Sequence, residues 1–164
     1  MRMHRLLVAV AVAAAIGLAG WTAAQERKTG TRPAGAKADP AQQQHYWDCA
    51  KACDDCARVC DACGAHCADL VAGGEKHHQE TLRTCQDCAA VCRAAGAITA
   101  RAGPFTDTIC TACADACKRC GDACERHGAG DAIMKKCADE CRACEKACRD
   151  MLKHVGRGAG AERR

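Results

Sequence analysis

Small and apolar side chains recur at intervals of three and four residues in four segments of the chain, with polar and charged residues between them. This spacing is the repeat of one face of a helix, so we expect four helices. Asp39 and Asp131 stand where they can cap the first and the fourth helix. The second helix is expected over roughly His77 to Arg101. Glycine and proline mark the expected helix ends, at Gly73–Gly74, Gly103–Pro104, Gly128–Gly130 and Gly156.

Cysteine occupies nearly every inward position of these helices, where leucine or valine normally packs. An average spacing of about 3.5 residues is that of the heptad seam by which helices pack together. We therefore predict an all-α fold, an antiparallel up-down-up-down four-helix bundle with a cysteine-lined core. All 18 cysteines are expected to point inward: Cys49, Cys53, Cys56, Cys60, Cys63, Cys67, Cys85, Cys88, Cys92, Cys110, Cys113, Cys117, Cys120, Cys124, Cys137, Cys141, Cys144 and Cys148.

Large side chains are scarce in the expected bundle. Beyond residue 24 the only Phe, Tyr and Trp residues are Tyr46, Trp47 and Phe105. Alanine and cysteine each bury little apolar area, so a bundle built from them is expected to need cross-links. Whether disulfides or metal ions supply the cross-links decides the function.

Disulfides are one alternative, because an exported chain with an even number of cysteines is their usual setting. Neighbouring positions on one helix have Cβ atoms about 5 to 6 Å apart, whereas a disulfide needs roughly 3.5 to 4.5 Å. Bridges within a helix would therefore be strained, and only bridges between helices remain. These do not explain why six successive inward positions of the first helix carry thiols.

Metal binding explains the density of thiols. Buried thiolates need neutralisation, and Cu(I), a singly charged ion that prefers soft sulfur, can neutralise them one for one. Two bonds of about 2.3 Å, taken from zinc–sulfur lengths, place the sulfurs of a linear S–Cu–S unit about 4.6 Å apart, which helix neighbours can span. Zinc or another thiophilic divalent ion is the competing cargo, although a closed zinc site needs four convergent ligands rather than a continuous stripe.

The start of the chain has the pattern of a secretory signal. Arg2 and Arg5 precede an apolar run from Leu6 to Ala19, and a small-residue stretch ends at Ala24. The apolar run is too short for a bilayer of ~30 Å, which needs roughly 20 residues, so no permanent membrane anchor is expected. We predict export, to the periplasm. The expected organisation is a signal peptide (1–24), a flexible leader (25–38), the four-helix bundle domain (39–156) and a disordered tail (157–164).

Charge and side-chain chemistry exclude other functional classes. The formal net charge of +4 comes from basic residues interleaved with acids, as around Lys51 or Arg142, which is typical of a solvated helix face and not of a nucleic-acid site. No nucleophile, base and orienting group occur together, so no catalytic residues are proposed and the protein is not expected to be an enzyme.

The four cysteine stripes, between Tyr46 and Val155, resemble those of the bacterial copper storage proteins. This resemblance implies many Cu(I) ions per chain, bound by thiolate pairs in the core, and a role in copper storage or detoxification. It also implies a homo-oligomer, with a tetramer as the expected assembly. Members occur in the cytosol and as exported proteins, and the N-terminal pattern here resembles the exported branch. The copper donor and recipient stay undefined.

The stripes extend beyond the cysteines to one end of the bundle at Leu70, His78, His127 and Met134. His78 lies seven residues before Cys85, His127 three after Cys124 and Met134 three before Cys137. We therefore predict that this end is the copper entry, with His78, His127 and Met134 as candidate ligands, although a polar helix end and core filling are the alternative roles.

The opposite end collects Tyr46, Phe105, Met151 and Val155. These larger side chains predict an apolar closure of the core, to which Met151 can add a thioether ligand. Four further histidines fall off the stripes and are expected to be surface residues: His45, His66, His77 and His154.

Overall fold

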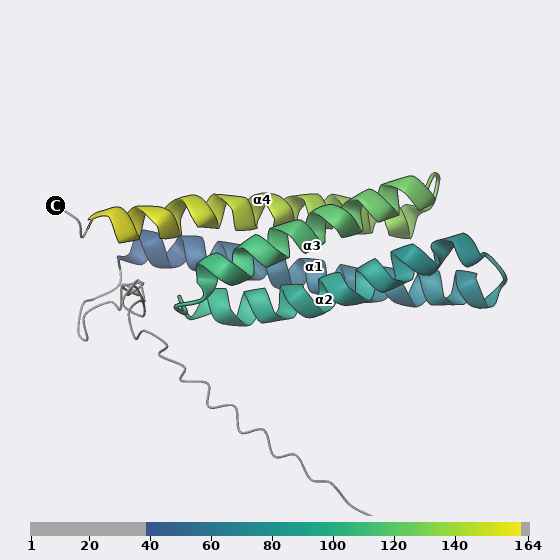
Figure 1. Cartoon of the computed structure of the whole chain (residues 1–164), viewed down its shortest axis with the longest axis horizontal. Helices are drawn as coiled ribbons and strands as arrows, with labels where there is room; N and C mark the ends of the chain where they lie inside the picture. The colour runs from purple at the N-terminus through teal and green to yellow at the C-terminus, as the bar shows by residue number, and fades with distance from the viewer. Residues whose placement is uncertain (1–38, 162–164) are drawn as a thin grey trace, which may run out of the picture.

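The chain folds as a four-helix bundle with alternating helix directions (Figure 1). The computed structural model describes residues 39–161, and the side chains of residues 39–155. The elements are α1 (Pro40–Ala72), a short 3₁₀ helix η1 (Lys76–His78), α2 (Gln79–Ala100), α3 (Thr106–His127) and α4 (Ala132–Ala161). The predicted all-α, up-down-up-down architecture is confirmed. The predicted signal peptide and leader lie outside the described residues.

Capping side chains start the first and last helices, as predicted. The carboxylate of Asp39 accepts a hydrogen bond from the backbone N–H of Ala41 at 3.0 Å, and Pro40 occupies the first helical position. Asp131 accepts hydrogen bonds from the N–H groups of Ile133 and Met134, at 2.8 and 2.9 Å. These acceptors satisfy amide groups that have no partner within the helix.

Glycines in the left-handed region make two of the turns. Gly74 has φ 103° in the α1–α2 turn, and Gly130 has φ 86° in the α3–α4 turn. Both turns lie at the same end of the bundle, on the right in Figure 1, whereas the α2–α3 turn lies at the opposite end. The prediction for the end of α4 was wrong, because Gly156 remains helical and the helix continues to Ala161. A glycine ends a helix only where the backbone leaves the helical region there.

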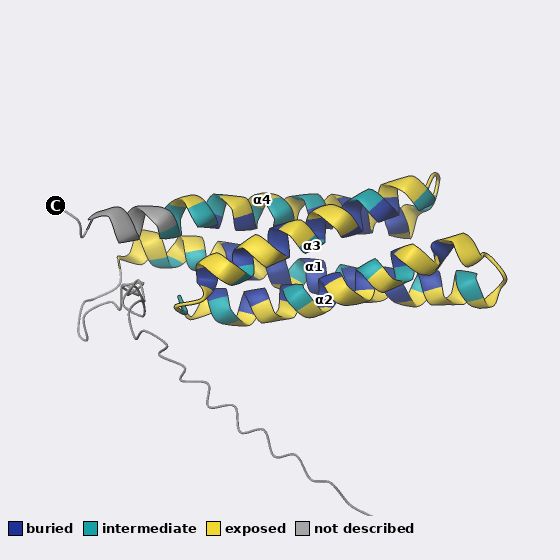
Figure 2. Ribbon diagram, in the orientation of Figure 1, coloured by how far each residue is buried: buried dark blue, intermediate teal, exposed yellow. Residues whose placement is uncertain are grey.

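The buried faces of all four helices converge on one axis, seen as the dark blue inner surfaces in Figure 2. Small residues let the helices approach closely. A Cβ placed on Gly64 of α1 would lie 3.6 Å from the Cβ of Cys85 on α2, and one on Gly121 of α3 would lie 3.4 Å from the Cβ of Cys141 on α4. This approach brings the cysteines of different helices into contact.

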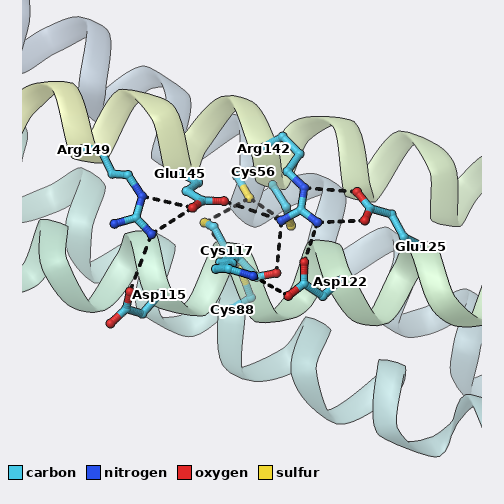
Figure 3. Close-up of polar contacts among 11 residues, drawn as sticks. Cys56, Cys88, Asp115, Cys117, Asp122, Glu125, Arg142, Glu145 and Arg149 are labelled. Atoms are coloured by element: carbon cyan, nitrogen blue, oxygen red, sulfur yellow. Dashed lines mark hydrogen bonds and ion pairs between the residues drawn. The ribbon is translucent and has the colours of Figure 1, made fainter.

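Ion pairs cover the outer surface between α3 and α4 (Figure 3). The Arg142 guanidinium lies 2.6 Å from Asp122, 2.8 Å from Glu125 and 3.5 Å from Glu145. In Figure 3 the sulfurs of the core lie beneath this network. The surface is therefore the mixed-charge face that the sequence predicts, and pairs of this exposure contribute little to stability.

Candidate metal centre

The core of the bundle is a continuous array of sulfur atoms, here called the thiol lane. It consists of the 18 cysteines, all free and all buried, with side chains from every helix. None of them exceeds 3% exposure. The structure therefore places all of the predicted inward thiols in one shared interior.

The thiols touch across helix boundaries as well as along each helix. The Sγ atoms of Cys92 on α2 and Cys117 on α3 are 3.5 Å apart, and those of Cys53 on α1 and Cys148 on α4 are 3.6 Å apart. Along one helix, the Sγ atoms of Cys88 and Cys92 are 3.8 Å apart. Contacts of 3.5 to 4.0 Å also join sulfurs of the middle of the lane to those nearer each end, as between Cys63 and Cys124 and between Cys49 and Cys148.

These separations set the kind of coordination that the lane can supply. With a metal–sulfur bond of about 2.3 Å, a linear site needs its sulfurs about 4.6 Å apart and a trigonal site about 4.0 Å apart. The sulfurs of Cys56 and Cys60 are 3.8 Å apart, and those of Cys63 and Cys124 are 3.9 Å apart. Linear pairs therefore require small side-chain rotations, whereas bent or three-coordinate sites fit the structure as it stands.

The groups of thiols that can surround one ion share their members. In each group all Sγ atoms lie within 4.8 Å of one another. Several cysteines belong to at least two such groups, so the lane has no isolated closed sites in this region: Cys56, Cys60, Cys88, Cys137 and Cys141. A continuous series of shared ligands suits bridging thiolates better than separate tetrahedral zinc sites. Five of the groups are Cys53/Cys113/Cys144/Cys148, Cys56/Cys60/Cys88/Cys141, Cys56/Cys88/Cys92/Cys117, Cys60/Cys120/Cys137/Cys141 and Cys63/Cys85/Cys124/Cys137.

Burial and hydrogen bonding shift the pKa values of thiols in the lane in opposite directions. Burial raises the pKa of the Cys67 thiol to about 12, and the charge of Cys63 adds to this shift. Hydrogen bonds from Cys113 and Cys144 lower the pKa of the Cys53 thiol to about 6. Because the thiolate is the ligand form, a buried thiol with a raised pKa, such as Cys67, releases a proton when it binds a metal ion.

One end of the lane carries a cluster of imidazoles and carboxylates, here called the mouth: His77, His78, His127, Glu75 and Glu80. The ring centroid of His77 lies 4.0 Å from that of His78 and 6.2 Å from that of His127. Glu75 Oε2 is 3.5 Å from His78 Nε2, and Glu80 Oε2 is 3.6 Å from His127 Nε2. The structure therefore brings the two predicted entry histidines together around His77.

Unsatisfied polar atoms gather at the mouth. Within the described part of the chain, the buried side-chain nitrogen and oxygen atoms that lack a hydrogen-bond partner are His78 Nδ1, Thr81 Oγ1 and His127 Nε2. All three residues belong to the helix ends that form the mouth and the first turn below it. Buried groups of this kind normally have a partner, so these atoms are available to a ligand.

Met134, the third predicted entry residue, is fully buried beneath the α3–α4 turn. A Cβ on Gly128 would collide with the Met134 side chain, so the glycine makes room for it. His66, expected to be a surface residue, is partly buried, and its Nε2 lies 2.6 Å from the Asp131 carboxylate at this same end. This contact joins the end of α1 to the start of α4.

The far end of the lane differs from its prediction at one residue. Met151 is 2% exposed, and Tyr46 and Val155 pack against the core. Phe105, however, is 66% exposed and does not contribute to an apolar closure. It lies in the turn before α3, where the helical repeat does not set the direction of a side chain.

A family model of copper storage proteins matches residues 42–153, which include all 18 cysteines. The chain belongs to the copper storage protein family. No curated protein sequence matches it.

Solved structures of copper storage proteins resemble the bundle. A cytosolic copper storage protein from Streptomyces lividans with five coppers is 33% identical, with a TM-score of 0.61, and the match covers 70% of this chain and 98% of that one. Ccsp from Streptomyces lividans loaded with 10 copper equivalents is also 33% identical, with a TM-score of 0.62 and coverage of 76% and 94%. The Cu(I)-bound copper storage protein BsCsp3 is 31% identical, with a TM-score of 0.60 and coverage of 66% and 99%.

Several residues of this member of the copper storage protein family were not predicted as core or mouth residues from the sequence. Thr81 falls on the stripe between His78 and Cys85, so the helical repeat could have identified it as a core residue. His77, Glu75 and Glu80 lie off the stripes, and only the folded turn brings them to the mouth. Within residues 39–161, no helix is long and apolar enough to span a bilayer.

Proposed function

We propose that this protein binds and stores many Cu(I) ions per chain in the thiol lane. The observation that carries the proposal is the lane itself, in which four helices place 18 buried free thiols in one interior. Copper-loaded relatives with the same bundle support it. Storage, rather than catalysis, is the activity that such a reservoir serves.

Charge balance favours a singly charged cargo. Each Cu(I) ion that replaces a thiol proton leaves the interior electrically neutral, so ions can be added until the thiols are used. A doubly charged ion would reach neutrality at half that number, and an excess of buried charge costs several kcal/mol per ion. The preference of Cu(I) for thiolate ligands acts in the same direction.

Copper is proposed to enter at the mouth. His78, His127 and Met134 are the candidate entry ligands, supported by the orphaned nitrogen atoms of both histidines and by the burial of the Met134 thioether at this end. Met151 is the candidate ligand at the far end of the lane. Replacing His78, His127 and Met134 together is expected to slow Cu(I) uptake while total capacity changes little, and an unchanged uptake rate would contradict this assignment.

We also propose that the protein is exported to the periplasm and assembles as a homo-oligomer. Export rests on the signal-like pattern of residues 1–24, which includes Arg2, Arg5 and the apolar run that follows. N-terminal sequencing of the protein from fractionated cells tests the cleavage after Ala24. Light scattering of the purified protein tests the tetramer expected from the family.

Anaerobic titration of the reduced protein with Cu(I) tests the storage function. Storage predicts a saturating stoichiometry close to the 18 thiols of one chain. Saturation at one or two ions would instead indicate a transfer chaperone. Uptake that appears only after a reductant is added would indicate a disulfide-bonded structural protein.

A further inference from the structure

We propose that the mouth receives Cu(II) and that thiols of the lane reduce it to Cu(I), so that the protein can take up oxidised copper directly. This inference rests on the proposed storage function and adds the oxidation state of the incoming ion. It concerns a stoichiometric reaction of the protein's own thiols, not a catalytic cycle.

The donor atoms of the mouth differ in kind from those of the lane. The mouth offers imidazole nitrogens from His77, His78 and His127, and carboxylate oxygens from Glu75 and Glu80 that lie 3.5 to 3.6 Å from two of those rings. Nitrogen and oxygen donors suit Cu(II), whereas thiolates and thioethers suit Cu(I). Glu80 also pairs through its Oε1 atom with Arg126, at 2.9 Å, while its Oε2 atom lies toward His127.

Buried polar atoms without partners provide the second observation. His78 is only 5% exposed, yet its Nδ1 has no hydrogen-bond partner. The buried Nε2 of His127 lacks one as well, because its 3.6 Å separation from Glu80 is beyond hydrogen-bonding distance. Lone pairs that are already desolvated and unpaired lose little on binding a metal ion.

Softer donors lie directly inside the mouth. The Met134 thioether is buried beneath the α3–α4 turn, and the thiols of Cys63, Cys85 and Cys124 form part of a group of four toward this end of the lane. An ion that moves inward therefore exchanges nitrogen and oxygen ligands for sulfur. That exchange stabilises Cu(I) relative to Cu(II) and favours reduction at this point.

Paired thiols can supply the electrons. Two Cu(II) ions take one electron each from two thiols, giving two Cu(I) ions, one disulfide bond and two protons released to solvent. The shortest contact between sulfurs near the mouth joins Cys85 of α2 and Cys120 of α3, at 3.6 Å. Cys85 lies seven residues after His78 and Cys120 seven before His127, about 10.5 Å along each helix. We assign Cys85 and Cys120 as the pair that is oxidised first.

Anaerobic addition of Cu(II) sulfate to the fully reduced metal-free protein tests the inference. At two Cu(II) ions per chain, the electron paramagnetic resonance signal of Cu(II) is expected to disappear. A thiol count should show the loss of two thiols for every two coppers reduced, and peptide mapping should locate the disulfide at Cys85–Cys120. A parallel titration with Cu(I) measures storage in the same preparation.

Two double variants distinguish a role of the mouth from reduction of Cu(II) by any accessible thiol. Glu75→Gln with Glu80→Gln is expected to slow the loss of the Cu(II) signal at least about tenfold, the scale on which loss of a metal-site partner lowers metal affinity. Cu(I) uptake should slow less than the loss of the Cu(II) signal does, because carboxylates are poor ligands for Cu(I). The matched control, Asp48→Asn with Asp107→Asn, removes two exposed carboxylates at the opposite end and should leave both rates unchanged.

The outcomes are distinguishable. The inference would be overturned by a persistent Cu(II) signal, by equal rates of Cu(II) loss in the two double variants, or by a first disulfide elsewhere in the lane. Normal Cu(I) uptake in the same preparation would leave the storage function intact. Failure of Cu(I) uptake in the parallel titration would instead overturn the storage function itself.

Discussion

Removing one group of four thiols should lower the copper capacity by about four ions. The group Cys53, Cys113, Cys144 and Cys148 is compact, with Sγ separations of 3.6 Å between Cys53 and Cys148 and 3.8 Å between Cys113 and Cys144. Replacing all four with alanine removes four ionisable thiols and thus four sites for a singly charged ion. If the lane held zinc at four thiolates per ion, the same change would remove about one ion.

The structure also sets the cost of this variant in stability. Each of the four side chains is fully buried, and each substitution leaves a void of about one sulfur atom. A loss of about 1 kcal/mol per site, the scale of deleting one buried methyl group, gives about 4 kcal/mol in total. Because domains are stable by only about 5 to 15 kcal/mol, circular dichroism must confirm the fold before the titration.

Anaerobic Cu(I) titration with a cuprous chelator as the indicator measures the change. The double variant Cys53→Ala with Cys148→Ala should lose about two ions and costs less stability, so it keeps the test decisive if the larger variant unfolds. Thr99→Val is the control, because it alters a buried residue beside Cys110 without removing a sulfur. A loss of one ion or none in the four-site variant would refute one-for-one neutralisation.

Further predictions concern stability and pH. Asp131→Ala should lower the free energy of unfolding by about 1 kcal/mol through loss of the α4 cap, as measured by urea denaturation. Met134→Ala should lower the free energy of unfolding by about 2 to 5 kcal/mol in the same assay, whereas Met134→Leu should lower it by less than about 1.5 kcal/mol. The leucine variant therefore tests the role of the thioether in copper entry with the fold preserved. Burial raises the pKa of the Cys67 thiol from 9.0 to about 12. The protonated thiol therefore contributes its full stabilisation to the metal-free fold below pH 9.0, and this contribution is lost as the pH rises towards 12. Anaerobic denaturation at increasing alkaline pH should therefore show falling stability, and a flat profile would contradict the assigned burial.

The fold and the thiol lane could be predicted because one repeat encodes both. Cysteine at successive heptad positions sets which face of each helix is buried, and the glycines at the turns fix the alternating directions. With short turns between the helices, the up-down-up-down bundle is the arrangement that buries all four faces. Asp39 and Asp131 could be predicted as helix caps because capping depends on residues that are close together in the sequence.

The ends of the bundle were harder to predict, because contacts there depend on turns and on helix rotation. Phe105 is exposed because it lies outside the helical repeat. The contact between His66 and Asp131 joins the end of one helix to the start of another. His45 lies near the start of α1 and His154 in α4, far apart in the sequence, yet their rings stack with centroids 4.0 Å apart. No local pattern encodes contacts of this kind.

A crystal structure of the Cu(I)-loaded protein, with copper located by anomalous scattering, tests the central claim most directly. The account predicts ions in a row along the bundle axis, each bound by cysteine sulfurs at about 2.3 Å. Copper confined to surface histidines, or core sulfurs joined to one another with no metal between them, would contradict it.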